Sequence, residues 1–442
     1  MSLPFRFAPE PVRAAPFAFL WVAVLLVGCA AAPPASVPAP AAPPAPVTTP
    51  SPAPPTGPTA AAAPADAALQ QDFARWVADF RAQARARGIG EPALSDAFDQ
   101  VRYLPRILPL DRAQPEFTRA VWDYLDTAVS AQRITRGQDK LAQVRAEAEA
   151  AATRYGVPAV VVVAIWGMES NYGSNFGDTP TIDALATLGF EGRRQDFARR
   201  ELMAALQIIE KGDIDHRHMI GSWAGAMGQT QFLPSSFLSY AVDADGDGRR
   251  DIWGSMADVT ASTANFLARS GWQPGQPWGV EVRLPEGFDP ARADDALRQG
   301  ASQWTAEGLR RMDGGPLPAI SDAALMLPAG ARGPAFLVGP NFRAILRYNN
   351  STSYALAVGL LAQALDGGPP VQAAWPRDLR MLSRSQLLVL QTALNERGFD
   401  AGTPDGMMGP ATRDGLRRYQ RSIGMPADGY PSLEVLQRLR TP

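Results

Sequence analysis

A proline- and alanine-rich tract near the N-terminus limits how much of this chain can fold into a compact domain. From Ala30 to Ala65 almost every residue is Ala, Pro, Thr, Ser or Val, and none is charged or aromatic. Such a stretch cannot build a hydrophobic core and favours an extended tether. The rest of the 442-residue chain has enough length for two or three domains.

The residues before this tract have the pattern of a targeting segment. Arg13 precedes an apolar run from Phe17 to Val27, which is shorter than the ~20 residues of a membrane-spanning helix. The run ends at Cys29, the only cysteine, in a context that resembles a bacterial lipobox. We therefore predict a lipoprotein signal peptide over residues 1–29, lipidation of Cys29 and a linker over 30–66. Ala30 resembles a sorting signal for the outer membrane, with the protein facing the periplasm.

The charge balance gives no sign of a nucleic-acid partner. The chain has 42 basic and 44 acidic residues, a formal net charge of −2, and its arginines are scattered. A nucleic-acid-binding protein usually carries a basic patch, so we expect no such partner.

Helical patterns dominate the chain after the linker. Apolar residues recur at helical spacing from Phe73, and residues 132–152 have high helix propensity. The run 157–166 is apolar throughout; its valines favour a strand, Pro158 favours a helix start, and periodicity does not decide between them. Another apolar helix is expected over 353–365, and the Gly-Gly-Pro-Pro sequence at 367–370 predicts a domain boundary.

The last ~65 residues form a unit of their own by length and pattern. Apolar residues, most of them leucines, recur at spacings of three and four in three short segments, separated by Asp-Gly turns. Ser383 and Gln386 fit a capping box at the start of the first segment. We predict three short helices.

Glu169 is the first candidate for chemistry. It follows the apolar run and precedes a glycine-rich loop, where a carboxyl group would be partly desolvated. Desolvation raises the pKa of a carboxyl group, which keeps a proton available for donation to a leaving oxygen. The alternative is a helix-terminal glutamate that points into water.

A second segment, from Ser222 to Ser236, adds residues suited to ligand binding. Its small residues allow close approach of a ligand, Gln231 can donate and accept hydrogen bonds, and Trp223 and Phe232 offer faces for sugar rings. Tight helix packing and core filling are the alternative explanation.

Together these segments resemble the membrane-bound lytic murein transglycosylase B family, glycoside hydrolase family 103, over residues 72–365. The matching motifs are Glu169 with Tyr172 and Gly173, the stretch 222–236, and Arg347-Tyr348-Asn349. The resemblance implies a lysozyme-like α+β fold and cleavage of the β-1,4 bond between N-acetylmuramic acid and N-acetylglucosamine. The products would end in 1,6-anhydromuramic acid. It places the acid/base at Glu169 and substrate contacts at Ser222, Gln231, Tyr172, Tyr348 and Asn349.

A single carboxylate suffices for this reaction, because the substrate can supply the nucleophile itself, whereas ordinary glycosidases use two acids. Asp178 and Asp183 lie in the following segment, and either of them facing Glu169 would favour a muramidase that uses water. The other alternative is a catalytically inert wall-binding lipoprotein.

Residues 243–258 predict a cation site. Asp243, Asp245, Asp247, Gly248 and Asp251 match an EF-hand-type loop, with the carbonyl of Arg249 at the seventh position, but Gly254 replaces the expected closing acid. The resemblance implies a longer loop closed by Asp258. We expect structural calcium and no other cofactor, the alternative being a solvated turn without metal. His216 and His218 are too few for a zinc site and are expected to be solvated.

The C-terminal unit resembles a peptidoglycan-binding domain, matched among others by Gln391, Asp405-Gly406 and Asp428-Gly429. We therefore predict a mainly α-helical protein: a lysozyme-like α+β catalytic domain over 67–368 and a three-helix peptidoglycan-binding domain over 376–442. We expect a monomer whose partners are glycan strands and, through a lipid anchor, the outer membrane.

Overall fold

The protein is described by a computed structural model that covers residues 63–113 and 119–440. The signal peptide, Cys29 and nearly all of the predicted linker lie outside the described residues. The chain divides into two units, residues 1–59 and 60–442, and the second contains every element described below.

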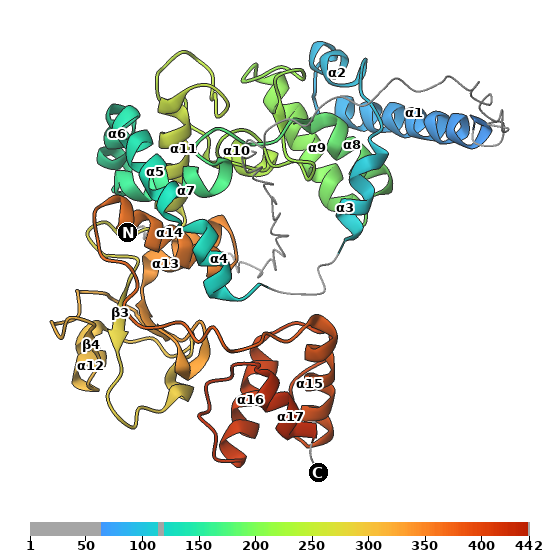
Figure 1. Ribbon diagram of the computed structural model, residues 1–442. Coiled ribbons are helices and arrows are strands. Elements are labelled where there is room, and N and C mark those ends of the chain that lie inside the picture. The colour runs from blue at the N-terminus through green and yellow to red at the C-terminus, as the bar shows by residue number, and fades with distance from the viewer. Residues whose placement is uncertain (1–62, 114–118, 441–442) are drawn as a thin grey trace, which may run out of the picture. The chain divides into compact units, whose positions relative to one another are not determined.

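Most of the fold is helical, as the sequence predicted (Figure 1). The helices before the C-terminal unit are α1 (Ala63–Ala86), α2 (Glu91–Phe98), α3 (Leu108–Arg112), α4 (Val121–Ala128), α5 (Ala131–Gln143), α6 (Arg145–Tyr155), α7 (Ala159–Ser170), α8 (Thr181–Glu191), α9 (Gln195–Glu210), α10 (Pro234–Tyr240), α11 (Met256–Arg269), α12 (Ala301–Ala306), α13 (Pro340–Tyr348) and α14 (Thr352–Leu365). Short 3-10 turns occur at Pro105–Ile107, Pro290–Arg292 and Gly330–Arg332.

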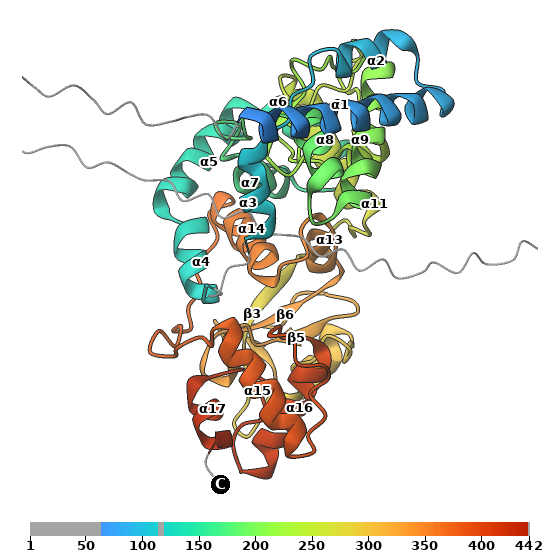
Figure 2. The same cartoon turned by 90° about the vertical axis from the view of Figure 1, so that its right-hand side faces the viewer.

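Helix α7 contains most of the apolar run 157–166, for which periodicity did not decide between a helix and a strand. Pro158 precedes its first turn, where a missing N–H costs nothing, and the helix contacts α5, α6, α11 and α14 (Figures 1 and 2). Residues 161–166 are all buried, so the valines pack on every side instead of along one sheet face. Tertiary burial therefore overrides their strand propensity.

Two small antiparallel sheets accompany the helices. Strands β1 (Thr179–Pro180) and β2 (Ile220–Gly221) pair beside the loop that follows α7. A four-stranded sheet has the order β4-β3-β6-β5, made of β3 (Gly279–Arg283), β4 (Arg310–Arg311), β5 (Ala324–Met326) and β6 (Ala335–Val338). Val280 pairs with Leu337 in this sheet, which has a separate small core around Trp304 and Leu309.

The C-terminal unit consists of α15 (Arg384–Glu396), α16 (Pro410–Ser422) and α17 (Leu433–Arg440), which confirms the three predicted helices (Figure 2). The Ser383 hydroxyl accepts from Gln386 N, and the Gln386 side chain accepts from Ser383 N, so the predicted capping box is present. Leu390, Leu394 and Leu416 are completely buried in a core of their own.

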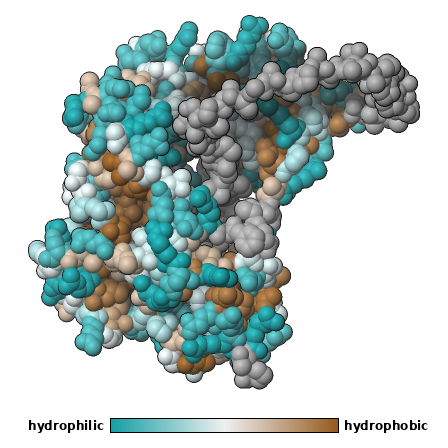
Figure 3. All heavy atoms as spheres, in the orientation of Figure 1, coloured by the Kyte–Doolittle hydropathy of each residue, from teal (hydrophilic) through white to brown (hydrophobic). Residues whose placement is uncertain are grey.

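Within the described residues, no single helix has both the length and the apolar composition to cross a membrane; only the pair α6 and α7, bent by 115°, passes on those two criteria together. The surface seen in Figure 3 mixes polar residues with separate apolar patches.

Candidate active site

Glu169 lies in the last turn of α7, where the helix ends abruptly. Asn171 and Tyr172 adopt left-handed backbone conformations, with φ of 49° and 58°. The Ser170 hydroxyl donates to Trp166 O and accepts from Gly173 N, both at 3.1 Å. These bonds fix the turn, so Glu169 is held in a defined place at the end of a buried helix.

The Glu169 side chain is partly accessible to solvent, but its carboxyl group is largely surrounded by protein atoms. The Tyr354 hydroxyl, from α14, donates a 2.5 Å hydrogen bond to its Oε1. Burial raises the pKa of Glu169 to about 7, although the bond from Tyr354 acts in the opposite direction. Near neutral pH a large fraction of Glu169 is therefore protonated and able to donate.

Two further tyrosines surround this carboxyl. Burial and the charge of Glu169 raise the pKa of Tyr124, on α4, to about 12, and they raise the pKa of the buried Tyr348 well above its ordinary value. Tyr354 is affected in the same way. All three phenols therefore remain protonated donors at neutral pH.

Tyr124 and Tyr354 were not among the residues predicted from sequence. Tyr354 lies inside an apolar helical pattern, where a tyrosine is ordinarily a core residue, and Tyr124 is 45 positions before Glu169 in the chain. Only the packing of α4 and α14 reveals their nearness to the carboxyl.

Neither candidate for a second carboxylate faces Glu169. Asp183 is completely buried on α8, where it accepts from the backbone and side-chain nitrogens of Arg102, both at 3.2 Å, and lies 3.5 Å from His216. Asp178 is exposed in the loop. No carboxylate of the described residues contributes to the pKa shift of Glu169.

The expectation that both histidines are solvated was wrong for His216 and correct for His218. His216 is 8% exposed and packs beside Asp183 because its backbone N–H is tied to Asp96. His218 is exposed, as expected, and pairs with Asp215 at 2.8 Å.

The segment 222–236 is tied to the loop after α7. Gln231, with φ of 51°, donates to Phe176 O at 3.0 Å and to Gly228 O at 2.9 Å. Ser222 closes a tight turn, since its hydroxyl accepts from Ala226 N at 3.1 Å. The Gln231 carbonyl oxygen and the Ser222 hydroxyl proton have no partner among the described residues, so each retains a group for a ligand.

Gln229 was missed by the sequence analysis and joins three parts of the site. Trp166 of α7 donates to its Oε1 at 2.8 Å, and its amide donates to Trp253 O at 2.7 Å. A Cβ at Gly173 would lie only 2.2 Å from the same Oε1. Gly173 is thus required by this close approach as well as by its φ of 75°.

Three predicted ligand-contact residues are buried in the core instead. Tyr172 is 2% exposed and its hydroxyl donates to Arg133 O at 3.0 Å; its ring fills the space beside Gly167. Tyr348 is 6% exposed and donates to Thr230 O at 2.7 Å. Phe232 packs against Tyr348 and offers no face to a sugar. These corrections follow from burial, since large aromatic side chains contribute much of the apolar area of a core.

Asn349 and Trp223 remain partly accessible. Asn349 ends α13, and its backbone carbonyl accepts from Ser351 N at 2.7 Å. Its side chain makes no hydrogen bond within the described residues, which leaves the amide available.

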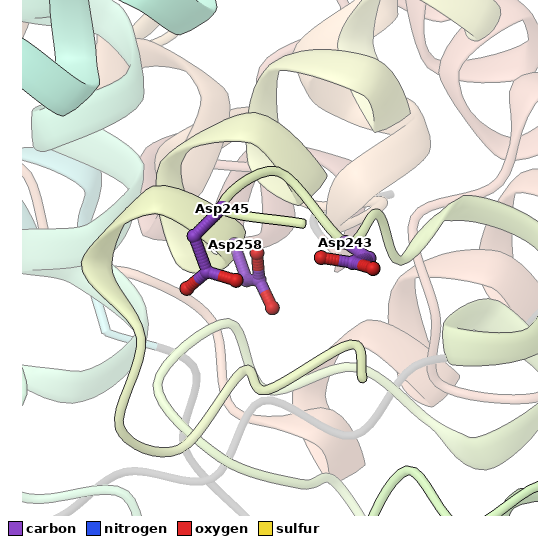
Figure 4. Close-up of side chains that lie close together, drawn as sticks. All are labelled: Asp243, Asp245 and Asp258. Atoms are coloured by element: carbon purple, nitrogen blue, oxygen red, sulfur yellow. The ribbon is translucent and has the colours of Figure 1, made fainter. Parts of the chain in front are cut away.

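The acidic loop brings three of its predicted ligands together. Carboxylate oxygens of Asp243, Asp245 and Asp258 lie within 4.8 Å of one another (Figure 4). Burial and the charge of Asp245 raise the pKa of Asp258, as expected where carboxylates converge. Such a set of oxygens fits a hard divalent cation.

The other predicted ligands lie outside this group. The Asp251 carboxylate accepts from the backbone N–H groups of Trp253 and Gly254, and Asp247 accepts from Arg249 N. Asp251 therefore stabilises the turn at Gly254, where the sequence lacks the acid of an EF-hand.

Comparisons with known proteins agree with this architecture. The model of the transglycosylase SLT domain family matches residues 72–363, and that of a peptidoglycan binding domain matches residues 383–439. A crystal structure of SltB3 from Pseudomonas aeruginosa in complex with NAG-anhNAM-pentapeptide is 53% identical, with a TM-score of 0.81, and the similarity covers 84% of this chain and 99% of that one.

Two relatives from Escherichia coli are more distant. Membrane-bound lytic murein transglycosylase B is 38% identical over 218 residues, which are 48% of this chain and 58% of that enzyme. The lytic transglycosylase Slt35, solved in complex with calcium, is 31% identical with a TM-score of 0.55, over 67% of this chain and 92% of that one.

Proposed function

The chain belongs to the transglycosylase SLT domain family, and from this premise we propose that it is a lytic transglycosylase that cleaves the glycan strands of peptidoglycan. The observation that carries the proposal is the Glu169 carboxyl, with a pKa of about 7, hydrogen-bonded to Tyr354 and facing no second acid.

Glu169 acts first as an acid. Its proton passes to the oxygen of the β-1,4 bond between N-acetylmuramic acid and N-acetylglucosamine, and the bond from that oxygen to C1 of the muramic acid breaks. The electron pair of that bond leaves with the N-acetylglucosamine. The carbonyl oxygen of the substrate's own N-acetyl group stabilises the cationic centre at C1.

Glu169 then acts as a base. Its carboxylate takes the proton of the O6 hydroxyl as O6 bonds to C1, which gives the 1,6-anhydro ring and restores the protonated carboxyl. No water is consumed. A hydrolase would need a second acid to activate water, and Asp183, the buried candidate, is held by Arg102.

The residues around Glu169 then have distinct tasks. Tyr354 orients the carboxyl and stabilises its ionised form by the hydrogen bond it donates. Ser222, Gln231 and Asn349 retain groups that can bind sugar hydroxyl and N-acetyl groups. Tyr172 and Tyr348 support the backbone segments that carry them.

Mass spectrometry of the products tests the function. Residues 60–442, the second unit of the chain, are incubated with purified peptidoglycan. We expect fragments that end in anhydromuramic acid. Fragments with reducing ends would indicate a muramidase, and the absence of any release would indicate a wall-binding protein.

We further propose that the loop 243–258 binds a structural calcium ion. Asp243, Asp245 and Asp258 supply converging oxygens, and the related Slt35 was solved with calcium. The ion would offset most of the negative charge of the three carboxylates and hold together the loop, which includes Trp253, whose backbone oxygen accepts from Gln229.

For the whole chain we propose a periplasmic, lipid-anchored enzyme. Cys29 would carry the lipid and residues 30–66 would form a tether. The catalytic domain would span 67–368, and a peptidoglycan-binding domain over 376–442 would keep it near its insoluble substrate. The family match at 383–439 and the membrane-bound E. coli relative support this arrangement.

A further inference from the structure

A cavity with a cationic lining lies between α4 and the segment that leads to the C-terminal helices. It has a volume of about 350 Å³, is open to solvent, and is lined by Arg119, Trp122, Asp123, Arg377, Arg380 and Met381 among others. Its volume is within the range of ligand sites, roughly 300 to 1,000 Å³.

The two walls of this cavity are fixed to each other. The Arg377 guanidinium donates to both oxygens of Asp126, on α4, at 2.7 and 2.9 Å. The rings of Trp122 and Trp375 pack with their centroids 6.4 Å apart. The bidentate ion pair and the packed aromatic rings hold the two walls in place, so the cavity has a defined shape.

Two arginines of the lining have no carboxylate partner. Arg119 and Arg380 are exposed, and neither makes a salt bridge within the described residues. Arg377 is neutralised by Asp126. The cavity therefore presents two available guanidinium groups against the single carboxylate of Asp123, an excess of positive charge that favours anions.

The cavity is close to the candidate active site. Tyr124 follows Asp123 on α4, and the pKa of its phenol responds both to Glu169 and to Arg119. Helix α4 also packs against α14, which carries Tyr354. Glu169 and Arg119 are therefore both near Tyr124.

We propose that this cavity binds the carboxylates of the peptide stem attached to the muramic acid held at Glu169, an inference that rests on the proposed function. Stem peptides carry a free terminal carboxylate and further carboxylates on acidic residues. The planar donors of arginine match carboxylates in geometry and charge. An extended stem of five residues reaches up to about 18 Å from the muramic acid.

Binding measurements test this inference on the full chain. The chain carries Glu169→Gln to prevent turnover, and isothermal titration calorimetry compares three disaccharides. One has no peptide, one bears a pentapeptide with free carboxylates, and one bears the same pentapeptide with its carboxylates amidated. We expect the free carboxylates to tighten binding about fivefold over the amidated form, as two exposed charge pairs would.

Two double variants identify the site. Arg119→Gln with Arg380→Gln should abolish the preference for free carboxylates. Arg87→Gln with Arg145→Gln removes the same charge from exposed arginines that do not line the cavity, and should keep it.

An unchanged preference in the first variant, or equal affinity for the free and amidated peptides before any arginine is changed, would overturn the inference. Failure of the proposed function is recognised separately, by the absence of anhydro products when Glu169 is intact.

Discussion

Replacing Glu169 by Gln should lower turnover but should raise the free energy of unfolding at alkaline pH. Glutamine keeps the shape and the acceptor for the Tyr354 hydroxyl but has no transferable proton. Since general acid–base catalysis contributes about 10²- to 10⁴-fold to a rate, and here one group performs both steps, we expect turnover to fall at least about a thousandfold.

The stability effect follows from the pKa of Glu169. The pKa is about 7 in the folded protein and 4.5 as an ordinary value, so between these pH values the folded state binds the proton that the unfolded state has lost. The free energy of unfolding of the wild type therefore falls as pH rises from 4.5 to 7. A full shift corresponds to about 3 kcal/mol, and partial solvent access reduces this to about 1–3 kcal/mol.

Glutamine does not ionise and escapes this loss. The difference in free energy of unfolding between the variant and the wild type should therefore be about 1–3 kcal/mol more favourable to the variant at pH 8 than at pH 4. Thermal unfolding at both pH values measures the gain, and Glu149→Gln, at an exposed position on α6, is the matched control. A stability difference between Glu169→Gln and the wild type that is independent of pH, or turnover retained by that variant, would refute the reasoning.

Three further predictions concern the surroundings of Glu169, the acidic loop and the turn beside β2. Tyr354→Phe removes the hydrogen bond that lowers the pKa of Glu169, so the alkaline limb of the kcat/KM profile should move to higher pH, with a loss of about tenfold to hundredfold in kcat; an unmoved limb would contradict this. Calcium at about 100 times its Kd should stabilise the wild type by about 2.7 kcal/mol in thermal unfolding, and Asp243→Asn should reduce that gain; equal gains would exclude the site. Gly177→Ala should cost about 3 kcal/mol in the same assay, because φ is +94° and the new Cβ would lie 2.0 Å from Gly221 O; a normal melting temperature would show that the turn adapts.

Much of the fold was readable because local signals agreed with one another. The Ser383–Gln386 capping box, the leucine spacing after it and the Asp-Gly turns all predicted the C-terminal helices. The four-stranded sheet was not located, since its strands have only two to five residues and too little alternation to be recognised.

The candidate site was predictable only where local sequence determines it. An acid after an apolar run and before a glycine-rich loop identified Glu169, which the structure places at the end of α7. The partners of Glu169 come from α4 and α14, far away in the chain, and no local pattern announces them. Conversely, Tyr172 matched a motif yet fills the core, because a motif does not say which way a side chain points.

The central claim is that one acid closes the anhydro ring without water. Its most direct test is to digest peptidoglycan with residues 60–442 in water labelled with heavy oxygen. The mechanism predicts muramic acid ends that contain no label and are one water molecule lighter than hydrolytic products. Label at C1 of those ends would show that water attacks the bond, and would contradict the assignment of Glu169 as both acid and base in ring closure.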